Sequence, residues 1–296
     1  MRETPYRVNL EELPADWQRA AQQALPAGML PHTLVMIPQH TQSLQKRRRF
    51  VPPQALGFTE TGVLQVQSAP ETSAPPEAFY INSADIVMLR HSLILLYGCL
   101  ELQGSMNGVP VRMVVEYNTV GELLLHAALQ QVLRQAYGPA AGNTAPKFAA
   151  ETASQLQALE AQSFKFRNGL SLYALLPEER LLGFVWQPRL MRPVLRIFRR
   201  AFAPAALLAV TPQAVIAIEE ERIKGAAYGW LITFCPRRRI LAIDTQPLHT
   251  AQHVTVHMAG AGLALSHTVA LDQARAAAWG ALWNSCNEEI RAEVNA

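Results

Sequence analysis

Short apolar runs separated by polar turns dominate the chain and predict β-strands. Apolar residues at 56–58 and 63–66 flank the polar stretch TETG, and residues 208–210 and 215–218 flank TPQA in the same way. Two apolar runs on either side of a four-residue polar turn predict a β-hairpin. We therefore expect a hairpin in each half of the chain.

The two hairpins belong to a longer internal repeat. The stretch RRRFVPPQALGFTETGVLQV begins at Arg47, and RRAFAPAALLAVTPQAVIAI begins 152 residues later at Arg199; the two align without a gap. The identical pairs are Arg47/Arg199, Arg48/Arg200, Phe50/Phe202, Pro52/Pro204, Leu56/Leu208, Thr59/Thr211 and Val63/Val215. Average composition gives about one identity in such a window by chance. The repeat predicts two copies of one domain.

Further strands are expected at matching places in both halves. They cover residues 30–38, 79–89, 97–104 and 109–117 in the first half, and 176–188, 233–243, 253–260 and 263–271 in the second. Each copy then closes on an amphipathic helix, at 121–137 and at 272–294, and Asp272 is a candidate cap for the second helix.

Two more helical segments lie outside the repeat in this interpretation. Residues 11–25 predict an N-terminal helix that Asp16 could cap, and a linker rich in Gly, Pro and Ala leads into a short helix at 148–162. The expected domain boundaries are an N-terminal helical extension at 1–28, the first domain at 29–138, the linker at 139–165 and the second domain at 166–296.

Composition indicates a globular protein of the reducing cytoplasm. Of the 296 residues, 50% are hydrophobic and 17% are charged. This hydrophobic fraction is typical of globular proteins that bury a core. No apolar run is long enough for a membrane span, and no signal peptide is expected. The cysteines, Cys99, Cys235 and Cys286, are few and far apart, so we expect neither a disulfide framework nor a zinc site.

The repeated pattern of strands followed by a helix resembles a tandem of bacterial pleckstrin-homology-like (PH-like or GRAM-like) domains. The resemblance rests on the LxxT start of each hairpin at Leu56 and Leu208, on the aromatic-polar-Ile pattern at 80–86 and 234–240, and on the closing helices. It implies a mainly β (α+β) fold: two PH-like sandwiches or barrels, each closed by a C-terminal amphipathic helix. It also implies a binding role without a catalytic signature.

Basic residues gather before each repeated hairpin, where the resemblance places the loop that binds anionic headgroups. The candidate anion-binding or lipid-binding residues are Lys46, Arg47, Arg48, Arg49, Arg189, Arg192, Arg196, Arg199 and Arg200. The Arg189 cluster also has helical spacing, which could place it on an anionic membrane, although Pro193 opposes a regular helix. Solvated loops, cationic sheet edges and nucleic-acid contacts are the alternatives.

Other polar clusters are interpreted as structural. His249, His253 and His257 are four residues apart, but the intervening valines favour a strand, in which they lie too far apart to share a metal. The acidic run at 219–221 is expected to be a solvated turn. Cys235 is the only candidate for a catalytic nucleophile, and it is expected to be a buried thiol.

These features predict a non-catalytic binding or scaffolding protein without a cofactor or bound metal. A protein partner or self-association is expected, at or away from an anionic membrane surface. The alternatives are a phospholipid-binding peripheral membrane module and an enzyme that uses Cys235. Nucleic acid is the least favoured partner.

Overall fold

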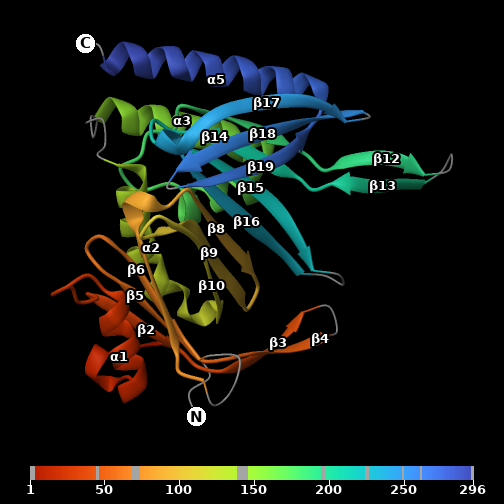
Figure 1. Ribbon diagram of the computed structural model, residues 1–296. Helices are drawn as coiled ribbons and strands as arrows, with labels where there is room; N and C mark the ends of the chain where they lie inside the picture. The colour runs from red at the N-terminus through yellow and green to blue at the C-terminus, as the bar shows by residue number, and fades with distance from the viewer. Residues whose placement is uncertain are drawn as a thin grey trace. The chain divides into compact units, whose positions relative to one another are not determined.

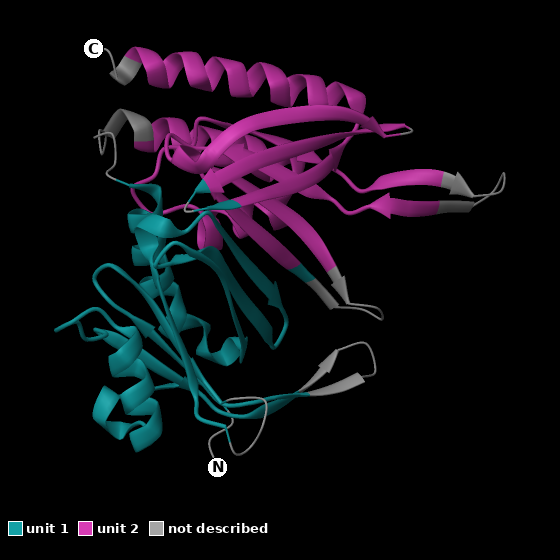
Figure 2. Cartoon of the chain, in the orientation of Figure 1, with its two compact units in different colours: residues 1–138, 222–229, 260–263 teal, residues 139–221, 230–259, 264–296 magenta. Residues whose placement is uncertain are grey.

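The computed structural model describes residues 4–44, 47–68, 74–138, 146–194, 198–223, 227–248, 250–260 and 262–294. The chain divides into two compact units (Figure 2). Unit 1 contains residues 1–138, 222–229 and 260–263, and unit 2 contains residues 139–221, 230–259 and 264–296. The fold is mainly β, with helices at the start and end of each series of strands (Figure 1).

Unit 1 begins with short elements and continues as a run of antiparallel strands. Its helical elements are η1 (Leu10–Glu12), α1 (Ala15–Ala24), η2 (Ser83–Asp85), η3 (Thr119–Gly121) and α2 (Glu122–Tyr137). Its strands are β1 (Tyr6–Arg7), β2 (Thr33–Ile37), β3 (His40–Leu44), β4 (Arg47–Val51), β5 (Gln54–Phe58), β6 (Gly62–Gln67), β7 (Glu77–Asn82), β8 (Met88–Ile94), β9 (Tyr97–Met106) and β10 (Val109–Asn118).

Unit 2 contains most of the remaining elements. Its helical elements are α3 (Pro146–Gln162), α4 (Phe164–Gly169), the π-helical turn η4 (Leu170–Ala174), η5 (Arg237–Arg239) and α5 (Gln273–Val294). The strands are β11 (Gly183–Gln187), β12 (Leu190–Val194), β13 (Phe198–Ala203), β14 (Ala206–Val210), β15 (Ala214–Ile223), β16 (Ala227–Pro236), β17 (Ile240–Leu248), β18 (Ala251–Gly260) and β19 (Leu263–Leu271). The ends of β15, β16, β18 and β19 that fall within 222–229 and 260–263 belong to unit 1.

The two series of strands follow the same order. In unit 1, β2, β5, β6 and β7 lie side by side in one sheet, and β8, β9 and β10 are neighbours in sequence order. In the second series, β11, β14, β15 and β16 are neighbours, and β17, β18 and β19 form a separate sheet. Each series contains a further two-stranded hairpin, β3–β4 or β12–β13, and ends on a helix, α2 or α5. The strand orders of the described residues have open ends, so none of these sheets closes into a barrel.

The predicted hairpins are confirmed, and their registers match. Phe58 pairs with Val63 across β5–β6, and Val210 pairs with Val215 across β14–β15. Every residue of β5 and of β14 is buried. The strands predicted downstream are confirmed as well: β7 to β10 and β16 to β19 occupy the segments predicted at 79–89, 97–104, 109–117, 233–243, 253–260 and 263–271.

A buried threonine closes both hairpins in the same way. The Thr59 hydroxyl accepts a hydrogen bond from the Gly62 amide (2.9 Å) and donates to the Gly62 carbonyl (3.1 Å). The Thr211 hydroxyl accepts from the Ala214 amide (2.9 Å) and donates to the Ala214 carbonyl (3.2 Å). This side-chain turn explains why the repeat contains a threonine at this position in both copies.

Helix α1 contributes to the core of unit 1, although its sequence predicts an extension outside the domain. Trp17 and Ala21 are buried in the cluster that contains Leu34, Leu64 and Tyr80 of the first sheet. The expected cap is wrong: the residue before the helix is Pro14, and no side chain caps its first turn.

Helix α3 packs against other elements of unit 2, although its sequence predicts a short helix in a linker. Leu159 is buried, and the Thr152 hydroxyl accepts a hydrogen bond from the Leu181 amide at 3.0 Å. Arg180 lies 3.1 Å from Glu151 of this helix and 2.6 Å from Glu289 of α5. Within the described residues, no helix is both long and apolar enough to cross a bilayer.

The threonine turns should be required for stability. Thr59→Val and Thr211→Val keep the side-chain shape but leave a buried amide without its acceptor, so each should lower the free energy of unfolding by about 1–3 kcal/mol. Urea denaturation monitored by circular dichroism measures the loss, and Thr245→Val at an exposed strand position is the matched control. Unfolding curves of both turn variants that match the wild type would contradict this role.

Candidate functional site

The two basic clusters lie on hairpins that occupy equivalent places in the two series of strands. Hairpin β3–β4 stands between β2 and β5, and β12–β13 stands between β11 and β14. Figure 1 shows β12–β13 extending away from the other strands of unit 2. The helical interpretation of the second cluster is wrong, because Pro193 lies within strand β12 and pairs with Arg199.

Only part of the candidate set can be placed. Lys46 and Arg196 lie outside the described residues. Of Arg47, Arg48, Arg49 and Arg199 only the backbone is described, in strands β4 and β13. The side chains of Arg189, Arg192 and Arg200 are described in full, and they differ in their surroundings.

Arg192 and Arg200 concentrate positive charge on the hairpin. They are directly opposite each other in the β12–β13 register, and both are exposed. Opposite residues of an antiparallel pair share one face, where like charges are destabilising unless an anion or solvent screens them. Met191, next to Arg192 in β12, is also exposed, and Phe50 is exposed on the other hairpin, in β4.

Arg189 serves the fold at the base of the hairpin. Its guanidinium donates to Glu220 Oε2, while Lys165 Nζ lies 3.0 Å from Glu220 Oε1. Burial acts to raise the pKa of Glu220, but the hydrogen bonds and positive charges of Lys165 and Arg189 outweigh it and lower that pKa. The expected acidic turn is therefore wrong: Glu219 and Glu220 lie in strand β15, and Glu219 lies 3.2 Å from the buried His267.

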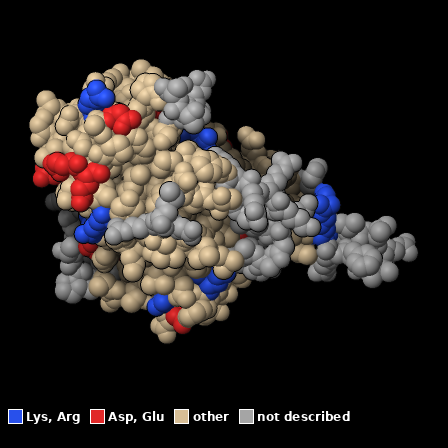
Figure 3. Space-filling view, turned by 90° about the horizontal axis from the view of Figure 1, so that it is seen from below, with Lys and Arg blue, Asp and Glu red and all other residues tan. Residues whose placement is uncertain are grey.

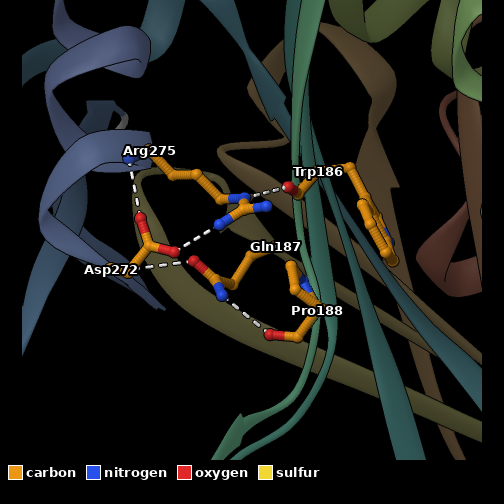
Figure 4. A network of polar contacts seen from close by, with 5 residues as sticks. All are labelled: Trp186, Gln187, Pro188, Asp272 and Arg275. Carbon is orange, nitrogen blue, oxygen red and sulfur yellow. Dashed lines mark hydrogen bonds and ion pairs between the residues drawn. The ribbon is translucent and has the colours of Figure 1, made fainter. Parts of the chain in front are cut away.

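A second polar network holds the base of the same hairpin against α5 (Figure 4). The buried Gln187, last residue of β11, accepts a hydrogen bond from the Asp272 amide and donates to the Pro188 carbonyl, both at 2.7 Å. Asp272 accepts from the Arg275 amide at 2.8 Å, which confirms it as the cap of α5. Arg275 Nε donates to the Trp186 carbonyl at 2.7 Å.

The surroundings of Asp272 stabilise its ionised form. Burial acts to raise the pKa of Asp272, but the hydrogen bonds and charge of Arg275 hold it below its usual range. A carboxylate at a helix N-terminus also meets the positive end of the helix dipole. Residues 186–189, which lead into β12–β13, are thus fixed by two networks on either side.

Unit 1 contains a hydrogen-bonded trio that the sequence pattern does not reveal. His91 Nε2 lies 2.6 Å from the Tyr117 hydroxyl, and that hydroxyl donates to Glu122 Oε2. Burial acts to raise the pKa of Glu122, but the hydrogen bonds from His91 and Tyr117 and the charges of His91 and His126 outweigh it and lower that pKa. His91 and Tyr117 are almost fully buried. The trio therefore fastens the first turn of α2 to β8 and β10.

Glu179 is a second buried carboxyl group that the sequence pattern does not reveal. It precedes β11, and its Oε2 accepts a hydrogen bond from the Leu176 amide at 3.2 Å. Burial raises its pKa to about 7, against the opposing effect of the hydrogen bonds from Thr211 and Leu176. No signal in the linear sequence distinguishes Glu179 from its exposed neighbour Glu178, because its burial depends on the hairpin that Thr211 closes.

The histidine row is confirmed as part of a strand. Val254 and Val256 of β18 are buried, whereas His253 and His257 are partly exposed on the other face, and His257 lies 3.0 Å from Asp244. His249 lies outside the described residues. Among the residues that the structure places, no three His, Cys, Asp or Glu side chains are arranged to hold a metal ion.

Charged residues are dispersed on the face seen in Figure 3. Blue and red side chains appear singly or in small groups among a surface that is mostly neither acidic nor basic, apart from the grey atoms. Among the residues drawn in colour, no single sign of charge covers this face.

Comparison of the chain with models of protein families, with curated proteins and with solved structures gives no match.

Glu179 should make stability depend on pH. Because its folded pKa of about 7 exceeds the ordinary value of 4.5, the unfolded state loses the proton first, and stability falls as pH rises between these values. The full loss is about 3 kcal/mol. Glu179→Gln should remove this dependence and be more stable than the wild type at pH 8 in urea denaturation. Glu178→Gln, at an exposed position, is the control, and a wild type whose stability does not fall over this pH range would contradict the assignment.

Cys235 should behave as a structural thiol, because its side chain in β16 is fully buried. In a background with Cys99→Ser and Cys286→Ser, a thiol reagent should label the native protein slowly and the unfolded protein at once. The rate of label uptake, followed by mass spectrometry at several pH values, is the measurement. Rapid, pH-dependent labelling of the native protein would instead favour an enzyme.

Proposed function

We propose that this chain is a non-catalytic binding protein with two pleckstrin-homology-like domains that holds a protein partner through its basic hairpins. The order of elements supports the domain assignment. In each series, four antiparallel neighbours (β2, β5, β6, β7 or β11, β14, β15, β16) precede three more strands and a closing helix. That order agrees with the half-open sandwich and plugging helix that the resemblance implies.

One observation carries the binding role. Both series insert a hairpin at the same place, and the described side chains of the two hairpins include exposed arginines and exposed apolar groups. Phe50, Met191, Arg192 and Arg200 are the exposed examples. Arg, Met and aromatic residues are the types enriched at the centres of protein interfaces. The two networks at residues 186–189 hold the base of β12–β13, so binding would require little ordering of that end.

An anionic membrane is the second candidate partner. The opposed Arg192 and Arg200 favour it, because two guanidinium groups on one face can donate in parallel to a phosphate group. Each basic residue near an anionic bilayer contributes about 1 kcal/mol, so the attachment would be sensitive to salt. The enzymatic alternative gains no support from the complete burial of Cys235.

Charge reversal on the hairpin tests the proposal. A photo-crosslinking amino acid at position 191 of the full chain should capture a discrete partner in cells, and Arg192→Glu with Arg200→Glu should reduce that capture at least about tenfold. Arg19→Glu with Arg291→Glu reverses two exposed arginines elsewhere and is the charge-matched control.

The same variants distinguish the two partners. If the wild type cosediments with vesicles of rising phosphatidylserine content and the hairpin variant does not, the membrane is the partner. If neither the crosslinked product nor vesicle binding changes in the hairpin variant relative to the control, the proposed function is wrong.

A further inference from the structure

The turn that leads into the first long strand of each series has the same backbone hydrogen bonds in both units. The Met29 amide donates to the Pro26 carbonyl at 3.0 Å, and the Glu179 amide donates to the Leu176 carbonyl at 2.9 Å. Three residues later, an amide in each unit donates at 2.9 Å to the carbonyl that precedes the hairpin threonine; the pairs are His32–Phe58 and Leu182–Val210. Met29 and Glu179 therefore occupy equivalent positions.

In unit 1, a thioether and hydroxyl groups connect this turn to the hairpin. The Met29 sulfur accepts from the Tyr80 and Thr61 hydroxyls, both at 3.4 Å. The Tyr80 hydroxyl in turn lies 3.2 Å from that of Thr59, which closes the hairpin. Pro26 has no amide hydrogen, so the turn needs no acceptor there. No carboxyl group takes part in these contacts.

In unit 2, a buried carboxyl group takes this place. Leu176 stands where unit 1 has a proline, and its amide needs an acceptor, which Glu179 Oε2 supplies at 3.2 Å. Phe234 stands where unit 1 has Tyr80, three residues before the 3₁₀ turn in each case, so this strand brings no hydroxyl group. The Glu179 carboxyl instead receives a hydrogen bond from the Thr211 hydroxyl.

The surroundings of Glu179 favour its neutral form. Its side chain is 9% exposed, and Oε1 has no hydrogen-bond partner among the described residues. The charge that acts on it comes from Glu178, another carboxylate. Arg180, the next residue, is bound instead by acidic side chains of α3 and α5. Since the hairpin turn at 211–214 contains no titratable side chain, an ionised Glu179 would be dehydrated and without a cation.

The threonine hydroxyl connects the charge of Glu179 to the hairpin. Thr211 Oγ donates to the Ala214 carbonyl at 3.2 Å, but a hydroxyl has one proton to donate. An ionised carboxylate attracts that proton more strongly than a carbonyl does, whereas a neutral carboxyl group leaves it with Ala214. Ionisation of Glu179 therefore weakens the turn of the hairpin and creates a buried charge at the same time.

Anchors on either side limit how much of the chain must move to relieve this charge. Before the turn, the Leu175 amide is bound by η4 at 2.8 Å, and after it the Leu181 amide is bound by α3 at 3.0 Å. Pro177 and Glu178 between them are already exposed. The carboxylate can reach water through rearrangement of residues 176–179 alone, which requires less free energy than unfolding of the unit.

We propose that Glu179 is a proton-operated latch of unit 2, which holds the turn at 176–179 against the Thr211 hairpin when protonated and releases that turn to solvent when ionised. Because Leu176 is 3% exposed in the closed form, release also uncovers this apolar side chain. The equivalent turn of unit 1, with Met29 in this place, stays closed over the same pH range. The latch does not rest on the proposed function of the basic hairpins.

The latch opens as pH rises. Burial raises the pKa of Glu179 from 4.5 to about 7 in the closed form, whereas the hydrated carboxyl of the open form has the ordinary pKa. The stabilisation of the closed form is therefore complete below pH 4.5 and is lost as pH rises to about 7, above which both forms are ionised. Opening at pH 7.5 should exceed opening at pH 5 by at least about tenfold.

Hydrogen exchange of the full chain, followed by mass spectrometry at pH 5 and pH 7.5, tests the latch. With labelling times scaled for the intrinsic exchange rate at each pH, the amides of 176–179 should lose at least about tenfold in protection at the higher pH. Glu179→Gln keeps the shape of the protonated side chain and cannot ionise, so it should stay protected at both pH values. Glu178→Gln is the matched control and should open like the wild type.

Three results would overturn the proposal. The wild-type turn could keep equal protection at the two pH values, in which case Glu179 titrates without releasing it, even if stability in urea still falls with pH. The loss of protection could persist in Glu179→Gln, which would assign it to another group. It could also spread equally over β14 and β15, which would mean unfolding of unit 2 rather than local release. The turn at 26–29 of unit 1 is the internal reference and should not change.

Discussion

A threonine hydroxyl at the turn of the central hairpin is the interaction on which each series of strands depends. It satisfies a buried amide and a buried carbonyl at once, which lets β5–β6 and β14–β15 turn inside the protein. Residues within the same turns also anchor the downstream 3₁₀ turns η2 and η5: the Ser83 amide donates to the Thr61 carbonyl (2.8 Å), and the Arg237 amide donates to the Gln213 carbonyl (2.7 Å). The turn therefore also sets where the second group of strands begins.

The two series of strands attach their closing helices through different side chains. In unit 1, Glu122 at the start of α2 binds Tyr117, which contacts His91 of β8. In unit 2, Asp272 caps α5 and connects it to Gln187 at the end of β11. Both networks are buried or partly buried and join a helix to strands, so their acidic and basic groups are explained by attachment. The proposed function rests instead on the exposed side chains of the hairpins β3–β4 and β12–β13.

The sequence predicted the elements whose pattern is local. Short apolar runs on either side of a polar turn identified β5–β6 and β14–β15, and Asp272 before an amphipathic stretch identified the start of α5. Hairpin β12–β13 was missed because Arg192 and Pro193 are poor strand residues, and a solvent-exposed hairpin lacks the apolar face that reveals a strand. The role of Glu220 was predicted wrongly because its partners Lys165 and Arg189 lie far from it along the chain, and Glu179 was not singled out because its burial depends on tertiary packing. The exposure of Leu95 and Leu123 depends on tertiary packing, which the spacing of residues along the sequence does not reveal.

Native-state hydrogen exchange at the Gly62 and Ala214 amides tests the central claim most directly. These two amides donate to the threonine hydroxyls at 2.9 Å, one in each series of strands. If the two turns are the common frame, both amides should exchange as slowly as the buried strand residues beside them, through global opening of their series. Exchange of either amide at the rate of an exposed turn would show that one hairpin is held by something else, and would contradict the account.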